Sequence, residues 1–150
     1  MNKVEVYKAE NEPVLGYKKG SKERLNVEKT YNEMFNSQVD IPLYIGSEEI
    51  LTNDRKNILP PHDHKNVVGT YSQANENHVN NAIKNLLDNK KSWSETTWKK
   101  RCEIFLKAAD LISDEYRAKI TAGTMIGQSK NIFQAEIDAA CEFVDFLKFN

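Results

Sequence analysis

The stretch that most constrains the fold is residues 131–150, which read NIFQAEIDAACEFVDFLKFN. More than half of these residues are apolar, and at helical spacing they cover more than one side of a helix. A helix that is apolar nearly all round is a buried helix. The pattern therefore predicts a helix that other parts of the protein must cover.

The same stretch carries acidic residues, and three of them share one face of the predicted helix. Asp138, Glu142 and Asp145 lie at positions i, i+4 and i+7. A buried carboxylate is costly unless it is paired or hydrogen-bonded. The helix is therefore either a structural element with one solvated edge or one wall of a binding site. Glu142 has small and aromatic neighbours and is the candidate for a ligand contact, whereas Asp138 and Asp145 are expected to be solvated.

No glycine, proline or other helix-ending signal follows Asn150. The few strands expected earlier in the chain are too small to cover so much apolar helix. We therefore expect this chain to be the first part of a longer polypeptide.

Composition and charge exclude several function classes. Of the 150 residues, 39% are hydrophobic and 29% are charged, and the net charge is -1. This balance gives no support to binding of nucleic acid or of an anionic membrane surface. No apolar run approaches the roughly 18 residues needed to span a bilayer. The first residues, MNKVEVYKAENEP, resemble neither a secretory signal nor a transit peptide, so a cytoplasmic location is expected.

The first half of the chain reads as an extended arm, a helix and a strand region. Residues 1–20 contain Pro13, Gly16 and Gly20 and predict an arm, after which Ser21 caps a polar surface helix that ends near residue 36. Alternation over residues 39–45 predicts one strand with a buried face, and a turn at 46–47 leads to a return strand. Two further extended pieces complete the strand region 39–72. Pro60 and Pro61 cannot both lie in a central strand, so this section is predicted to be an edge strand or a meander.

The region 75–150 reads as helical. Asn75 caps its first helix, Thr96 or Thr97 its second, and the Ser113–Asp114 pair its third, which Gly127 ends. The fourth is the helix of residues 131–150. The order of elements indicates an α/β or α+β protein.

Three motifs invite a catalytic or metal-binding interpretation, and each has a simpler one. His62-Asp63-His64 contains metal ligands, but a zinc site needs three or four convergent ligands and this segment follows two prolines. Cys102 and Cys141 lie in apolar helical patterns and are interpreted as free buried thiols, which are inert. The spaced glycines of residues 123–130 do not open a helix after a strand, so they match no phosphate-binding loop.

Several segments nevertheless resemble a known family. These are NEPVLG at residues 11–16, GSKER at 20–24, IFLKAADLIS at 104–113, TMIGQSK at 124–130 and QAEIDAA at 134–140. Together they resemble the delta-1-pyrroline-5-carboxylate dehydrogenases, which are members of the aldehyde dehydrogenase superfamily. The similarity runs from about residue 11 to the end of the chain.

The resemblance implies a fold and an activity. Residues 1–150 would form the N-terminal segment of the NAD-binding domain, an incomplete α/β unit of antiparallel strands and one helical layer. The whole enzyme would oxidise L-glutamate γ-semialdehyde to L-glutamate in proline catabolism, with a cysteine nucleophile and NAD as hydride acceptor. In this family the catalytic residues and the NAD-binding stretch follow residue 150. The resemblance therefore implies no catalytic, cofactor-binding or metal-binding residue in this chain, which should be inactive alone.

One site residue carries over from the family, and it is Glu142. The family places a glutamate of this helix near the α-amino group of the substrate, and a carboxylate would pair with that ammonium group. The resemblance also implies a homo-oligomer at full length and, as an alternative location, the mitochondrial matrix. Two other functions stay open: a stand-alone helical interaction domain without enzymatic activity, and an aldehyde dehydrogenase with another substrate.

Overall fold

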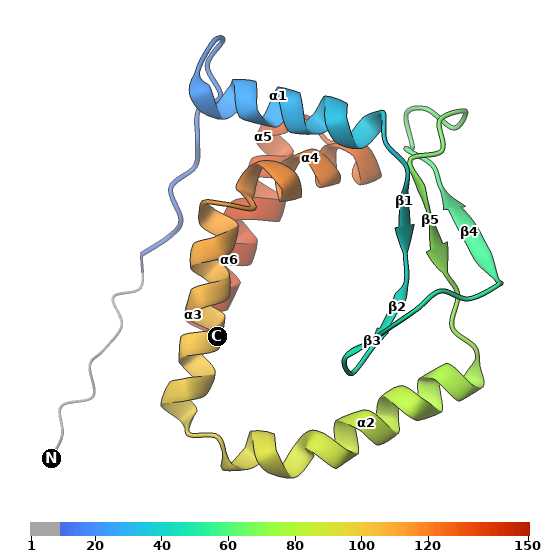
Figure 1. Cartoon of the computed structure of the whole chain (residues 1–150). Coiled ribbons are helices and arrows are strands. Elements are labelled where there is room, and N and C mark those ends of the chain that lie inside the picture. The colour runs from blue at the N-terminus through green and yellow to red at the C-terminus, as the bar shows by residue number, and fades with distance from the viewer. Residues whose placement is uncertain (1–9) are drawn as a thin grey trace, which may run out of the picture.

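The computed structural model describes residues 10–150, so most of the first half of the expected arm lies outside the described residues. In Figure 1 the elements follow one another around an open frame, with α1 along one side, the strands on the next, then α2, and finally the packed helices α3 to α6. The elements are α1 (Lys22–Phe35), β1 (Val39–Ile41), β2 (Leu43–Ile45), β3 (Glu48–Ile50), β4 (Arg55–Ile58), β5 (Gly69–Ser72), α2 (Glu76–Glu95), α3 (Trp98–Ser113), α4 (Arg117–Gln128), α5 (Ile132–Ala135), the π turn η1 (Glu136–Cys141) and α6 (Glu142–Phe149).

Helix α1 begins after Ser21, as predicted from that capping residue. The side chain of Ser21 accepts a hydrogen bond from the Arg24 backbone, and the helix ends at Asn36. One of its residues, Val27, is buried, because α1 packs along α4. The helix is therefore polar on its outer side, as expected, but it is anchored by an apolar contact on the inner side.

The single strand predicted over residues 39–45 is wrong, because the structure divides it into two strands of different sheets. Strand β1 pairs in parallel with β5, whereas β2 pairs antiparallel with β3 around a turn at Gly46. Pro42 lies between them, and proline has no N–H group to continue a ladder. The expected buried face is also missing from β1, since Val39 and Ile41 are 53% and 42% exposed.

The three-stranded sheet has the order β1-β5-β4, which leaves β4 at an edge. Its edge position just before the two prolines agrees with the prediction for that segment. Strand β5 lies so close to β1 that a Cβ atom on Gly69 would sit 2.3 Å from the Val39 carbonyl oxygen. A side chain at this position would therefore separate the two strands.

Helices α2 and α3 begin where the sequence predicts. The Asn75 side chain accepts a hydrogen bond from the His78 backbone N–H, and the His78 ring accepts one from the Asn75 backbone N–H, so the two residues form a capping box. Thr97 caps α3. No residue of α2 is buried, and its apolar face is exposed. Trp93, near the end of α2, lies under the guanidinium group of Arg101 at 5.9 Å.

The predicted Ser113–Asp114 cap of the next helix is wrong. The Ser113 hydroxyl donates to the Asp110 carbonyl inside α3, and Asp114 ends α3. The Tyr116 N–H reaches back to the Leu111 carbonyl, so the chain makes an extra turn and α4 begins only at Arg117. At its other end α4 continues through Gly127, and Ser129 takes the left-handed conformation with φ of 55°.

The helix predicted over residues 131–150 is present, but η1 interrupts it. Its inward residues Ala135, Ala140 and Val144 are fully buried. Phe133, whose side chain is 52% exposed, and the other phenylalanines of this stretch remain largely open. The expectation of a helix buried nearly all round is therefore only half right within residues 10–150. No helix among these residues is long and apolar enough to cross a membrane.

Candidate binding pocket

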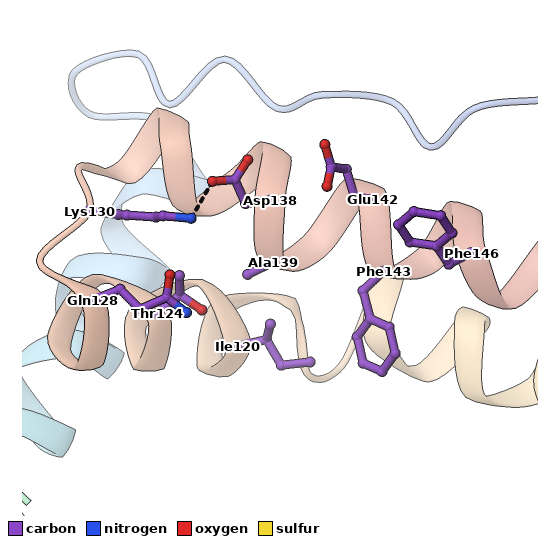
Figure 2. A pocket seen from close by; sticks show the side chains of 9 residues that line it. All are labelled: Ile120, Thr124, Gln128, Lys130, Asp138, Ala139, Glu142, Phe143 and Phe146. Atoms are coloured by element: carbon purple, nitrogen blue, oxygen red, sulfur yellow. Dashed lines mark hydrogen bonds and ion pairs between the residues drawn. The ribbon is translucent and has the colours of Figure 1, made fainter.

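A pocket of about 430 Å³ lies between α4 and the helix formed by η1 and α6. In Figure 2, Ile120 and Thr124 of α4 and Ala139 of η1 lie where the two helices face each other, whereas Glu142 points away from α4. Its wall combines apolar side chains, among them two aromatic rings, with two carboxylates and one ammonium group. The lining residues are Ile120, Thr124, Gln128, Lys130, Asp138, Ala139, Glu142, Phe143 and Phe146.

Glu142 is the carboxylate of this pocket that stays available for a ligand. It begins α6 and is exposed, and in Figure 2 its carboxylate and the Phe143 ring point to opposite sides of the helix. No residue in the range 10–150 forms a hydrogen bond or an ion pair with its side chain. A small cation that entered the pocket would therefore meet a carboxylate without a competing partner.

The other two acids of the predicted stripe are already paired. Lys130 forms an ion pair with Asp138, drawn in Figure 2. Asp145 accepts hydrogen bonds from the Asn11 side chain and the Glu12 backbone, both at 2.7 Å. The interpretation of Asp145 as a solvated residue is thus wrong, because it holds the segment that precedes α1.

The fully buried acid of this helix is Glu136, which is not among the three acids that helical spacing places on one face. One of its oxygens accepts from the Leu15 backbone at 2.9 Å, and the other from the Tyr17 hydroxyl at 2.6 Å. Arg117 completes the set with hydrogen bonds from its guanidinium group. These partners offset the cost of taking a carboxylate out of water.

Arg117 connects three parts of the chain. Besides Glu136, its guanidinium donates to the Glu12 carboxylate at 2.6 Å, to the Pro13 carbonyl at 2.7 Å and to the Cys141 sulfur at 3.4 Å. The planar fork of arginine permits several such bonds at once. We refer to Glu12, Tyr17, Arg117, Glu136 and Cys141 as the Arg117 cluster.

The ionisation of the cluster follows from these contacts. Burial alone would raise the pKa of Glu136, but hydrogen bonds from Arg117, Tyr17 and the Leu15 backbone outweigh it and hold that pKa below its usual range. Burial would lower the pKa of Arg117, and its bonds to Glu136 and Glu12 raise it instead. The pair is therefore charged at neutral pH.

The segment of residues 11–17 is held along one side of the helix by this cluster. Glu12 also pairs with Lys148 at 2.9 Å, and Tyr17 is buried with a positive φ of 45°. A left-handed backbone is uncommon for a bulky residue and persists only where surrounding contacts impose it. A signal for these contacts was present in the sequence, because residues 11–16 and 134–140 are among the segments that carry the family resemblance.

The two cysteines differ. Cys141 is buried as expected, and burial together with the nearby Glu136 carboxylate raises the pKa of its thiol to about 11. Such a thiol is protonated at neutral pH and is a poor nucleophile. The prediction that Cys102 is buried is wrong, since its side chain is exposed on α3, in the part of that helix where apolar neighbours are also open.

The His62-Asp63-His64 segment contributes a structural contact. His62 is hydrogen-bonded to Ser129 at 2.7 Å and to Tyr31 at 3.3 Å, and its ring stacks on Phe35. No group of three potential metal ligands occurs among residues 10–150. His62 therefore joins α1 to the end of α4.

The β5–α2 junction, residues 73–75, lacks the features by which such a junction holds a dinucleotide. Phosphate-binding junctions of this kind use glycines that bring backbone N–H groups of a helix N-terminus to the pyrophosphate. Here residues 73–75 contain no glycine, and the Asn75 side chain already occupies the His78 N–H at the start of α2. The junction does not fit NAD, and we assign no NAD contact to it.

Comparisons with known proteins agree with the resemblance seen in the sequence. The model of the aldehyde dehydrogenase family matches residues 51–150. The chain is 46% identical over 141 residues to a probable delta-1-pyrroline-5-carboxylate dehydrogenase of Schizosaccharomyces pombe, covering 93% of this chain and 26% of that protein. The corresponding mitochondrial enzyme of Dictyostelium discoideum is 41% identical over 140 residues, covering 93% and 25%.

The fold also matches the corresponding part of a solved enzyme. The crystal structure of the delta-pyrroline-5-carboxylate dehydrogenase of Mycobacterium tuberculosis bound with NAD superposes with a TM-score of 0.93 and 35% identity, over 96% of this chain and 27% of that one. The chain thus spans about a quarter of the length of the relatives it matches. The expected α/β class and N-terminal portion of an aldehyde dehydrogenase fold are confirmed. The chain belongs to the aldehyde dehydrogenase family.

Proposed function

We propose that this chain is the N-terminal part of an NAD-dependent enzyme that oxidises L-glutamate γ-semialdehyde, the open form of 1-pyrroline-5-carboxylate, to L-glutamate. The observation that carries the proposal is the similarity to enzymes of that name over 93% of the chain. In this proposal residues 1–150 are the N-terminal segment of the NAD-binding domain, with an arm at 1–20, a strand region at 39–72 and a helical region at 75–150. NAD and the reacting aldehyde carbon belong to the remainder of the enzyme.

Glu142 is proposed as the contact for the substrate's ammonium group. The pocket supports this role because Glu142 has no partner among the described residues, while Lys130 neutralises Asp138. A charge-assisted hydrogen bond to an ionised group contributes about 1.5–3 kcal/mol. Pairing with Glu142 would therefore favour an amino aldehyde over the same aldehyde without the amino group.

The activity is tested with the full-length protein and purified substrates. We expect NADH formation with glutamate γ-semialdehyde and much weaker turnover of 5-oxopentanoate, which has the same carbon chain and lacks only the amino group. Aliphatic aldehydes serve as a third class. Preference for an aldehyde outside this set would indicate an aldehyde dehydrogenase with another substrate, and failure to reduce NAD with any aldehyde would favour the interaction-domain alternative.

The role of Glu142 is tested by Glu142→Ala in the same protein. The expected result is a KM for glutamate γ-semialdehyde raised by roughly 10- to 100-fold, because about 1.4 kcal/mol corresponds to a factor of ten. The KM for 5-oxopentanoate should stay nearly unchanged. Asp138→Asn is the matched control, since it removes a pocket carboxylate that is already paired. Equal effects of Glu142→Ala on both substrates would remove the specificity role.

We also propose an assembly and a compartment for the full-length protein. A homo-oligomer follows from the family resemblance and is tested by size-exclusion chromatography with light scattering on the full-length protein. For the compartment we keep the cytoplasm and, as the alternative, the mitochondrial matrix; the Dictyostelium discoideum relative is named as a mitochondrial enzyme. Fluorescence imaging of the tagged full-length protein in its own cells separates the two.

A further inference from the structure

The π turn η1 ends immediately before Glu142, the residue proposed to bind substrate. The Glu142 backbone N–H donates to the Ile137 carbonyl, five residues back, whereas an α-helix would direct it to residue 138. A wide turn of this kind inserts one residue into the helix and rotates everything after it by roughly 100°. The direction in which Glu142 faces therefore depends on η1.

The two ends of η1 meet on one side chain. Glu136 begins the turn and Cys141 ends it, and both contact the Arg117 guanidinium. Their side chains also approach each other, with 3.6 Å between the Cys141 sulfur and a Glu136 carboxylate oxygen. In an α-helix, residues five apart point about 140° away from each other. The contacts of Arg117 with both residues are thus compatible with the wide turn and not with a regular α-helix.

The segment of residues 11–17 forms hydrogen bonds to the helix at two places. Tyr17 and the Leu15 backbone bond to Glu136 at the start of η1, and Asn11 and Glu12 bond to Asp145 in α6. The helix is therefore fixed at the start of the wide turn and again after it. Neither Arg117 nor Tyr17 lines the pocket, so any influence they have on a ligand must pass through the helix.

We propose that Arg117 and Tyr17 are positioning residues for substrate specificity, which maintain the π turn and so direct Glu142 toward the substrate's ammonium group. This inference rests on the proposed function of Glu142 and adds the device that orients it. In this proposal the Arg117 cluster acts through the helix, since neither Arg117 nor Tyr17 lines the pocket.

The test uses full-length Arg117→Lys and Tyr17→Phe variants with the two matched substrates. Lysine keeps the positive charge but cannot contact Glu12, Glu136 and Cys141 together. Phenylalanine removes a single hydroxyl that lies 2.6 Å from Glu136 and serves if the lysine variant does not fold. Arg24→Lys is the control, because Arg24 pairs with Glu28 on the exposed side of α1.

The expected result is a specific loss of amino-group discrimination. Arg117→Lys should raise the KM for glutamate γ-semialdehyde by about tenfold, as expected for a weakened charge-assisted bond, and Tyr17→Phe by less. The KM for 5-oxopentanoate and both kcat values should change little. Combined with Glu142→Ala, neither substitution should reduce the discrimination further, because all three act through one contact. A crystal structure of Arg117→Lys should show the Glu142 N–H turned to the Asp138 carbonyl.

Three results would overturn the inference, and they can be told apart. If Glu142→Ala lowers discrimination while Arg117→Lys and Tyr17→Phe do not, the positioning role fails and the proposed site survives. If Glu142→Ala itself has no effect on discrimination, the proposed site fails and the positioning role fails with it. Losses that add to that of Glu142→Ala would also contradict the inference.

Discussion

The region of residues 11–17 with 117–149 and the region of β1 to α2, residues 39–95, solve the problem of burial in opposite ways. The first region buries charge: Arg117 and Glu136 are both buried, and each of their charged groups has partners. The second leaves apolar surface open, with Leu86 and Leu87 of α2 exposed by 71% and 62%. The buried charges of the first region find their partners within residues 10–150, whereas the second region presents apolar surface along a whole helix.

The difference matters because buried charge is tolerated only when its partners are in place. A set of bonds such as that around Glu136 must be formed by residues 10–150 themselves, since a missing partner would cost several kcal/mol. Exposed leucines carry no such requirement and can be covered by the remainder of a larger domain. This fits a chain that spans about a quarter of its relatives.

The largest expected effect comes from breaking a pair in each region. In the full-length protein, Arg117→Met should lower the free energy of unfolding by about 3–5 kcal/mol, because it leaves the Glu136 carboxylate buried without its cation. Arg55→Met, which removes the exposed pair with Asp40 in the strand region, should cost about 1 kcal/mol or less. Urea denaturation followed by circular dichroism measures both. Equal shifts would erase the proposed contrast.

A smaller effect is expected from removing single hydroxyl groups. Tyr17→Phe should cost about 1–3 kcal/mol, since its hydroxyl is buried against a carboxylate. Tyr44→Phe in β2, where the side chain is 68% exposed, should stay within about 0.5 kcal/mol. The same denaturation experiment reports both values. A Tyr44 cost as large as that of Tyr17 would contradict the expected difference between an exposed and a buried hydroxyl group.

The smallest effect near neutral pH is expected from titration of Glu136. Its pKa is lowered in the folded protein, so the stabilisation is present above the ordinary glutamate value of about 4.3 and is lost as the pH falls through the lower folded value. Thermal melts of wild type should therefore fall more steeply below about pH 4 than melts of Glu136→Gln. Parallel pH profiles of the two proteins would contradict the charged state of Glu136.

The sequence predicts the helices better than it predicts the contacts between them. Asn75 and Thr97 mark helix starts because a cap is a local interaction. The cap at Ser113–Asp114 failed because the hydroxyl of Ser113 bonds within α3, and the strand over 39–45 failed because its halves pair with different, distant partners. Sheet pairing depends on segments far apart in the chain, which periodicity does not report.

The candidate site shows the same limit of local patterns. Helical spacing grouped Asp138, Glu142 and Asp145, and the structure supports an available carboxylate at Glu142 in the pocket. The spacing gave no sign that Glu136 is the buried acid, because its partners Tyr17 and Arg117 are 119 and 19 residues away. It also assumed a regular helix, and η1 changes the facing of every residue after it.

The most direct test of the central claim, that residues 39–95 form one face of a larger enzyme, is amide hydrogen exchange on two lengths of the protein. The chain of residues 1–150 and the full-length protein are compared peptide by peptide. The account predicts that α2 exchanges rapidly in the short chain and slowly in the full-length protein, with a smaller difference for residues 132–149. Equal protection of α2 in the two proteins would contradict it.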